Sequence, residues 1–295
     1  MSVKKTIEQS LSETNMTMIS NDSFYELTKD NKVLRISKKQ EIYLRTAIYG
    51  FDFYFNSVVP IQINDKLLVD YSTPKYHHVS GFDEFDLLCP SMAEPYDSVN
   101  QYLDFANLQK GNVVLDIGAY SGLSSIAFSK CVGENGIVYS LEPDENNYYC
   151  LEKNIEAYYN HGYPQNIKLF KKAIWTHTGS LEFSSECNMG SSAVDIVGSR
   201  GFTVSVECTT LSDFASDQNI QSIDFIKCDI EGSEAYIFND EKFFQKYKPK
   251  IILETHKING VYCNQTCIDT LSKYGYSHKI VEQNGLELPL IEFEI

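Results

Sequence analysis

The pattern of apolar and polar positions predicts strands and helices in regular succession from about residue 96 onward. Short apolar runs, typical of buried parallel strands, alternate with longer stretches whose apolar residues recur at helical spacing. The expected strands are 113–117, 136–141, 167–170, 223–229 and 250–254, and the expected helices are 98–106, 123–132, 145–160 and 264–274. Strands that alternate with helices in this way predict an α/β fold built on a parallel sheet.

The pattern changes at the end of the chain. Residues 276–282 and 286–295 carry alternating apolar residues on either side of a Gln-Asn-Gly turn at 283–285. Two strands joined by such a turn predict an antiparallel hairpin. The hairpin would extend the parallel sheet to seven strands.

The residues before 96 lack this alternation. The first thirty are polar without a sustained period, which favours a loose arm or short helices, and 39–49 fits a helix or a strand. Apolar residues on both sides of Asn64-Asp65 predict a hairpin. We therefore expect an N-terminal arm and accessory region over 1–95, on the acceptor side, and a main domain over 96–295.

The turn after the first predicted strand contains Asp116, Gly118 and Gly122. The two glycines leave no Cβ in the way of a ligand, and the helix that follows presents free N–H groups. The turn contains neither the Gly-Lys-Ser/Thr of a P-loop nor the spacing G-x-G-x-x-G of dinucleotide-binding proteins. A carboxylate in the turn would repel a pyrophosphate, so it suits a ligand with a positive charge.

A second acid, Glu142, follows the second predicted strand directly. In doubly wound folds an acid at this place binds the two hydroxyls of a ribose. Either acid alone is also compatible with a plain structural turn. Both acids in one βαβ unit favour a nucleoside ligand.

These residues resemble the FkbM-type group of S-adenosylmethionine-dependent methyltransferases. That group usually carries D-I-G-A-N-x-G, then E-P, then K-x-D-x-E-G-x-E. The corresponding segments here are 116–122, reading DIGAYSG, Glu142-Pro143, and 227–234, reading KCDIEGSE. The resemblance covers roughly 94–256, and Tyr120 takes the place of the usual Asn.

The resemblance implies a Rossmann-like, seven-stranded methyltransferase sheet with helices on both faces, and the terminal hairpin distinguishes this sheet from dinucleotide-binding relatives. It also implies S-adenosylmethionine as the methyl donor. The cofactor-binding residues that it implies are Asp116, Gly118, Ala119, Tyr120, Ser121, Gly122, Glu142, Pro143, Ala173 and Asp229.

The candidate catalytic residues are Asp229 and His256. Methyl transfer to oxygen is an in-line displacement, and a base or a metal that lowers the pKa of the acceptor hydroxyl assists it. Asp229 ends the fourth predicted strand, while Glu254 and His256 lie at the end of the fifth and point the same way. Asp229, Glu254 and His256 can therefore hold Mg²⁺, Mn²⁺ or Fe²⁺. The alternatives are that His256 acts as a base without a metal, or only bonds to a loop.

Two further acids follow Asp229 and open the next helix. We interpret Glu234 mainly as a residue that caps this helix, where acids favour the positive N-terminal end. Glu231 is interpreted as a residue that lines the pocket.

Composition limits the partners. The chain has 25 Lys and Arg against 40 Asp and Glu, a formal charge of −15, which opposes nucleic acid or an anionic membrane as a partner. Its eight cysteines include no C-x-x-C, and several fall in strand-like runs, which fits the reducing cytoplasm. No apolar run reaches the length of a membrane span.

We therefore predict a cytoplasmic O-methyltransferase for a small hydroxylated acceptor. The resemblance implies sugars of surface polysaccharides or of natural products, and a nucleotide-activated sugar is favoured. Alternatives are a peptide, amine or other secondary-metabolite acceptor, an NAD-dependent oxidoreductase, and a non-catalytic module that binds S-adenosylmethionine. The oligomeric state is open, with a homodimer as one option.

Overall fold

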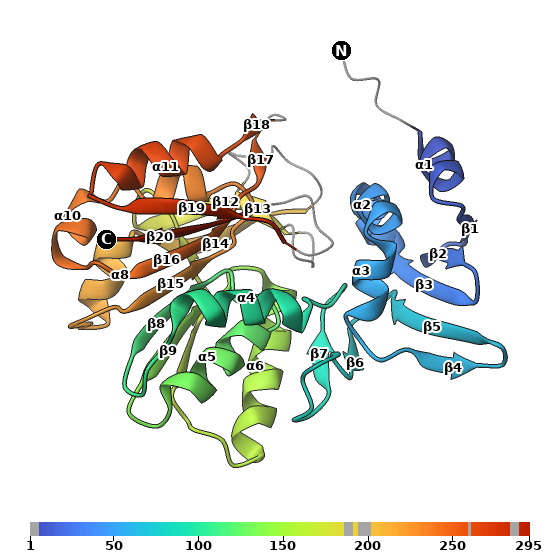
Figure 1. Cartoon of the computed structure of the whole chain (residues 1–295), viewed down its shortest axis with the longest axis horizontal. Coiled ribbons are helices and arrows are strands. Elements are labelled where there is room, and N and C mark those ends of the chain that lie inside the picture. Colours follow the sequence, from blue (N-terminus) through green and yellow to red (C-terminus); the bar gives the residue numbers. More distant parts are fainter. Residues whose placement is uncertain (1–5, 186–190, 194–201, 259–260, 284–288) are drawn as a thin grey trace. The chain divides into compact units, whose positions relative to one another are not determined.

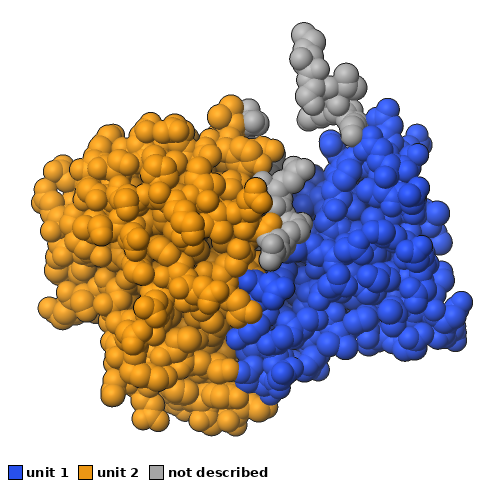
Figure 2. Space-filling view, viewed as in Figure 1, with its two compact units in different colours: residues 1–97 blue, residues 98–295 orange. Residues whose placement is uncertain are grey.

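The computed structural model describes residues 6–185, 191–193, 202–258, 261–283 and 289–295. The chain divides into two compact units, Met1–Asp97 and Ser98–Ile295, which Figure 2 draws in different colours. The two units are described separately below.

The second unit is built on a seven-stranded sheet (Figure 1). Its strands are β8 (Val113–Ile117), β9 (Ile137–Leu141), β10 (Ile167–Phe170), β15 (Phe225–Cys228), β16 (Lys250–Glu254), β19 (Ser277–Val281) and β20 (Leu290–Glu294). They lie in the order β10-β9-β8-β15-β16-β20-β19. The first five are parallel, and β20 is antiparallel to both β16 and β19.

This sheet confirms the predicted fold class, including the terminal hairpin. The centre of the predicted hairpin turn, 284–288, lies outside the described residues. The central strands are apolar because they are covered on both faces: every residue of β15 is buried.

Helices cover the two faces of the sheet (Figure 1). One face carries α4 (Tyr96–Ala106), α5 (Leu123–Val132) and α6 (Glu145–Asn160), and the other carries α8 (Leu211–Asp217), α10 (Glu241–Lys246) and α11 (Asn264–Ser272). Aromatic side chains contribute to the packing, as where the rings of Phe128 and Phe225 meet edge to face with centroids 5.5 Å apart. The short α9 (Glu234–Ile237) follows β15.

Smaller sheets accompany the main one. The strands β11 (Ala173–Ile174), β14 (Phe202–Thr209), β12 (Gly179–Ser185) and β13 (Ser192–Ala193) form a four-stranded sheet in that order. The strands β17 (Lys257–Ile258) and β18 (Val261–Tyr262) form an antiparallel pair.

The strand order reverses between β8 and β15, since the chain continues from β8 to β9 on one side and β15 pairs with β8 on the other. In open α/β sheets ligands bind beyond the carboxyl ends of the strands at such a switch point. A Cβ built on Gly118 would lie 1.9 Å from the carbonyl oxygen of Asp229. The loops after β8 and β15 therefore meet at this edge, and only glycine fits at 118.

The first unit contains a five-stranded sheet in the order β1-β2-β3-β5-β4. Its strands are β1 (Thr17–Ser20), β2 (Phe24–Lys29), β3 (Lys32–Ser37), β4 (Ile61–Ile63) and β5 (Lys66–Tyr71), with a separate pair, β6 (Lys75–His77) and β7 (Leu87–Cys89). Its helices are α1 (Ile7–Glu13), the 3₁₀ helix η1 (Lys38–Tyr43), α2 (Leu44–Tyr49) and α3 (Phe51–Asn56).

This unit corrects one prediction and confirms another. Of the two options predicted for the first thirty residues, a short helix is found at Ile7–Glu13. Neither option holds for residues 17–29, because β1 and β2 join the sheet and β2 buries Tyr25 and Leu27 on one face. The hairpin at Asn64-Asp65 is confirmed: β4 and β5 pair antiparallel around it, and Asn64 takes a left-handed conformation. The predicted role of this region towards the acceptor stays a prediction.

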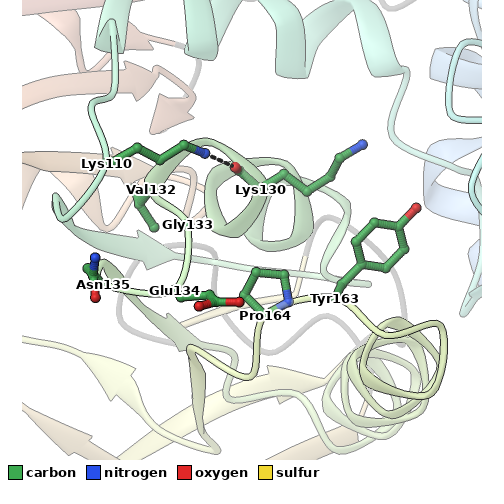
Figure 3. A pocket seen from close by; sticks show the side chains of 8 residues that line it. All are labelled: Lys110, Lys130, Val132, Gly133, Glu134, Asn135, Tyr163 and Pro164. Atoms are coloured by element: carbon green, nitrogen blue, oxygen red, sulfur yellow. Dashed lines mark hydrogen bonds between the residues drawn. The ribbon is translucent and has the colours of Figure 1, made fainter.

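A pocket of about 510 Å³ lies at the amino edge of the main sheet, opposite the switch point (Figure 3). Its lining residues precede strands: Lys110 precedes β8, 133–135 precede β9, and 163–164 precede β10. Inside it, the Nζ of Lys110 donates to the carbonyl oxygen of Lys130 at 2.9 Å. Among the described residues, no helix is long and apolar enough to cross a membrane.

Candidate active site at the carboxyl edge of the sheet

The loop from β8 to α5 is held against the end of β9. Gly118, Tyr120 and Gly122 all have positive φ, at +79°, +49° and +90°. The N–H groups of Gly118 and Ala119 both donate to the carbonyl oxygen of Leu141 at 3.0 Å. The loop therefore turns back over β9 before α5 begins, and glycine relieves the strain at two of the three positions.

Asp116 lies beneath this loop with no exposed surface. Its Oδ2 accepts hydrogen bonds from the hydroxyls of Ser124 at 2.7 Å and Ser125 at 2.6 Å. The Nζ of Lys227 lies 3.6 Å from its other oxygen and donates to the carbonyl oxygen of Gly118 at 2.6 Å. Asp116 thus braces the loop from within, and its predicted contact with the cofactor stays a prediction.

Glu142 joins the tip of β9 to the same loop. Its Oε2 accepts from the N–H of Tyr120 at 3.0 Å, and its Oε1 accepts from the N–H of Asp144 at 2.9 Å. Burial raises the pKa of Glu142 to about 8. Below that pH the carboxyl group is mostly protonated, and a protonated carboxyl group can both accept and donate hydrogen bonds.

The remaining predicted cofactor residues lie at the same edge. Residues 119–121 are buried, and Gly118 and Pro143 are half-buried. Ala173 is buried on β11, shortly beyond the carboxyl end of β10. The structure thus brings the loop, the tip of β9 and Asp229 to one edge.

His256 lies at the centre of a cluster of acids. Its Nε2 is 3.4 Å from Oε1 of Glu231, 3.6 Å from Oε1 of Glu254 and 3.7 Å from Oδ1 of Asp229. The imidazole side chain is 8% exposed, whereas that of Asp229 is 27% exposed. The cluster is therefore buried behind the imidazole and open on the side of Asp229.

Glu234 fixes the other nitrogen of the ring. Its carboxylate is fully buried, and Nδ1 of His256 lies 3.2 Å from its Oε1. The two oxygens also accept from the N–H groups of Ile230 at 2.8 Å and Gly232 at 2.7 Å. Because these donors stabilise an ionised carboxylate, Nδ1 carries its proton towards Glu234 and Nε2 is directed at the other three acids.

The charges act on one another. Burial alone would lower the pKa of His256, but the neighbouring carboxylates of Glu231, Glu234 and Asp229 outweigh it and raise this pKa well above the usual value. Burial, together with the charge of Asp229, raises the pKa of Glu254 to about 8. The cluster therefore has more negative than positive charge, and a bound cation would relieve it.

The model of the FkbM methyltransferase domain matches residues 116–277, more than half of the chain. The protein belongs to the FkbM methyltransferase family. The family depends on S-adenosylmethionine. The family, the enzyme class and the methyl donor that were predicted from the sequence are therefore confirmed. No curated protein matches the chain at a significant level.

Solved structures resemble the chain distantly. A precorrin-6y C5,15-methyltransferase from Geobacter metallireducens is 14% identical over 69% of this chain and 90% of its own, with a TM-score of 0.45. A methyltransferase FkbM from Methylobacillus flagellatus is 17% identical over 66% of this chain and 50% of its own, with a TM-score of 0.44. A SAM-dependent O-methyltransferase from Thermotoga maritima is 11% identical over 69% of this chain and 66% of its own, with a TM-score of 0.42. The strand order, and not these likenesses, identifies the fold.

In this FkbM methyltransferase the role of Asp229, Glu254 and His256 as metal ligands stays a prediction, and the three side chains that lie mutually close are Asp229, Glu231 and His256. Asp229 and Glu254 both lie within 4 Å of Nε2 of His256. Glu231 lies closer to Nε2 than either of them, and a carboxylate oxygen of Glu231, one of Asp229 and a ring nitrogen of His256 all lie within 4.8 Å of one another. The sequence interpretation gave Glu231 only a lining role.

The function of Glu234 was also missed in part. Its carboxylate accepts from N–H groups of the turn before α9, and not from those of the helix it was expected to cap, and it also anchors the imidazole. The spacing of the acids in 227–234 already indicated a polar site, since four polar residues follow one buried strand. What could not be foreseen is the left-handed turn at Glu231 and Gly232, with φ of +56° and +103°, which directs the two glutamates to one ring.

Proposed function

We propose that this FkbM methyltransferase transfers the methyl group of S-adenosylmethionine to a hydroxyl of a small acceptor, and that the acceptor is a sugar, most of all a nucleotide-activated one. The observation that carries the proposal is the orientation of His256. Its Nδ1 is anchored by Glu234, so its Nε2 faces the partly exposed Asp229 beside the glycine loop. A hydroxyl that enters there meets a group able to take its proton.

The residues at the switch point fit the donor. Gly118 and Pro143 are half-buried at the carboxyl edge, and Glu142 offers a carboxyl group at the tip of β9, where a ribose is bound in such folds. The donor supplies an electrophilic methyl group on a positively charged sulfur. The acids of this edge, Asp229 first among them, suit that charge, while Asp116 and Lys227 hold the loop in shape.

We propose the following cofactor contacts on this basis. Glu142 binds the ribose hydroxyls, the backbone of 118–122 lies along the donor, and Ala173 flanks the adenine, as the family resemblance implies. If Glu142→Ala left the affinity for S-adenosylhomocysteine unchanged, the ribose assignment would be wrong. Isothermal titration calorimetry measures that affinity directly.

The acceptor hydroxyl is activated by the cluster around His256. Two routes are available to it: Nε2 of His256 takes the proton directly, or the hydroxyl binds to a cation that the cluster holds. In the first route, the positively charged sulfur of the bound donor, and not a metal, lowers the raised pKa of His256 towards neutrality, as a base requires. Chelation separates the two routes.

The acids also favour one second candidate. A peptide or amine acceptor brings a positive charge, which Asp229 and Glu231 would attract, whereas they would repel the phosphates of a nucleotide sugar. In the sugar proposal the hydroxyl end of the acceptor must therefore face the cluster.

The test is transfer of label from methyl-labelled S-adenosylmethionine into a panel of nucleotide sugars, free sugars, amines and peptides. We expect incorporation into a sugar, and a loss of about 10²-fold or more in His256→Ala. The control is His177→Ala, because His177 is an exposed histidine outside the site. Nearly intact turnover in folded His256→Ala would refute the role of the ring, and labelling of amines alone would refute the sugar.

A further inference from the structure

We propose that Asp229, Glu231 and His256 form a binding site for one divalent cation, with Glu254 as a further oxygen ligand. The catalytic use of this cation rests on the proposed function, but its binding does not. The site differs from the set predicted by sequence because Glu231 is added as a direct ligand.

The distances fit a cation. Metal–ligand bonds of about 2.0–2.2 Å place neighbouring ligand atoms about 3.0–3.5 Å apart. Nε2 of His256 lies 3.4 Å from Glu231 and 3.7 Å from Asp229, and the ligand atoms of all three lie within 4.8 Å of one another. Small side-chain movements would therefore close the site around an ion.

The second observation is the state of the imidazole. Nε2 is buried and makes no hydrogen bond among the described residues, although three acids surround it. A buried nitrogen without a partner requires an explanation, and an unseen ion is one of the usual ones. Since Nδ1 is directed to Glu234, the lone pair of the neutral ring would lie at Nε2, towards the acids.

The surroundings of the ring match those of metal-binding histidines. Such a histidine nearly always gives its other N–H to a carboxylate or carbonyl, which fixes the tautomer and makes the ligand more basic. Glu234 does this here, and it is itself held by two backbone N–H groups. Glu254 is oriented in the same manner, because Gln283 donates to its Oε2 at 2.9 Å and leaves Oε1 facing the ring.

The donor set indicates the class of ion. Carboxylate oxygens suit Mg²⁺ and Mn²⁺, and an imidazole favours transition metals, so a site with both is suited to Mn²⁺. The rival explanation is a permanently protonated ring that pairs with the acids without any metal.

In the reaction, the cation would bind the oxygen of the acceptor and lower the pKa of its hydroxyl. The hydroxyl proton is released to solvent, the oxygen forms a bond to the methyl carbon, and the carbon–sulfur bond breaks with its electron pair on sulfur. The products are a methyl ether, a neutral thioether and one proton, so charge and atoms balance.

The test is titration of the full-length protein, treated with EDTA and dialysed, with MnCl₂, while electron paramagnetic resonance measures free Mn²⁺. We expect one bound ion per chain. Glu231→Gln should weaken binding by at least about 10-fold, and Glu234→Gln by about 10- to 100-fold, although Glu234 is no ligand. The matched control is Glu156→Gln, an exposed acid on α6, which should bind as the wild type does.

Equal binding by Glu231→Gln and wild type would overturn the site, as would wild-type binding no tighter than that of His256→Ala. If a variant does not fold, the wild type alone still decides, because Mn²⁺ at this site must broaden the ring resonances of His256 before those of the other five histidines.

Label transfer separates this proposal from the proposed function. Mn²⁺ binding without transfer to any sugar would support the site and refute the acceptor. Transfer that survives EDTA in a protein that binds no Mn²⁺ would refute the site and keep the function, with His256 as the base.

Discussion

Replacement of Gly118 by alanine tests whether the loops after β8 and β15 meet as closely as the structure has them. The residue has φ of +79°, and a Cβ there would lie 1.9 Å from the carbonyl oxygen of Asp229 and 3.0 Å from its carbonyl carbon. Both atoms belong to the backbone next to the acid that faces His256. The new methyl group can be accommodated only if the loop that carries Asp229 moves.

Two costs add. A left-handed conformation costs an alanine about 1–2 kcal/mol, and forcing an extra carbon into packed structure costs a further ~1–3 kcal/mol. We therefore expect Gly118→Ala to lower the free energy of unfolding by roughly 2–5 kcal/mol. In a unit of this size, each kcal/mol lowers Tm by roughly 2–4 °C.

Gly162→Ala is the matched control, because Gly162 has φ of +83° and nothing lies within 4 Å of its ideal Cβ. It carries the conformational cost without the collision. Urea unfolding followed by circular dichroism gives both losses, and their difference measures the contact between the loops. If the two variants lose the same stability, the close approach of Gly118 to Asp229 is wrong.

Three further predictions concern the buried acids. Burial raises the pKa of Glu142 from 4.5 to about 8. Between these pH values the folded protein holds a proton that the unfolded chain has lost, so stability falls as pH rises. In Glu142→Gln the fall in Tm from pH 5 to pH 8 should be shallower, and a slope equal to that of the wild type would contradict this origin. Glu234→Gln should lower the pKa of His256, which NMR titration of the ring measures; an unchanged pKa would show that Glu234 does not hold the ring. Ser124→Ala should cost about 1–3 kcal/mol in urea unfolding, because it removes a hydrogen bond from the fully buried Asp116, and a neutral result would contradict the bracing role of that acid.

Much of the main sheet could be predicted because its strands are buried on both faces. Such strands are almost wholly apolar: in Phe225–Cys228 the one exception is Lys227. The glycines and acids that follow the strands mark their ends. The seven-stranded sheet with its terminal antiparallel hairpin followed from the family resemblance, and the structure confirms it.

The N-terminal sheet could not be predicted in the same way. Strand β2 buries only Tyr25 and Leu27, and its other residues are polar or half-exposed, so its alternation covers too few positions to stand out. Strand β2 is stabilised by pairing with its neighbours β1 and β3. The alternation of apolar and polar residues in those two strands is also short. Where tertiary pairing decides, local periodicity is a weak guide.

The segment 227–234 connects the two halves of the candidate site. At its start Lys227 binds the carbonyl oxygen of Gly118, and at its end Glu234 holds the ring of His256. Glu234 also closes the turn between them, since its two oxygens accept from the N–H groups of Ile230 and Gly232. The single residue left between those two contacts is Glu231, whose carboxylate faces the same ring.

One carboxylate therefore sets both the orientation of the imidazole and the conformation of the turn that presents Glu231. A sequence motif shows that Glu231 and Glu234 are present, but their joint action depends on the left-handed turn at 231–232. Because this turn begins directly after Asp229, whose carbonyl oxygen lies against Gly118, the glycine loop after β8 and the cluster around His256 meet at one piece of backbone. Under the proposed function, a change that shifts this backbone would affect donor binding and acceptor activation together.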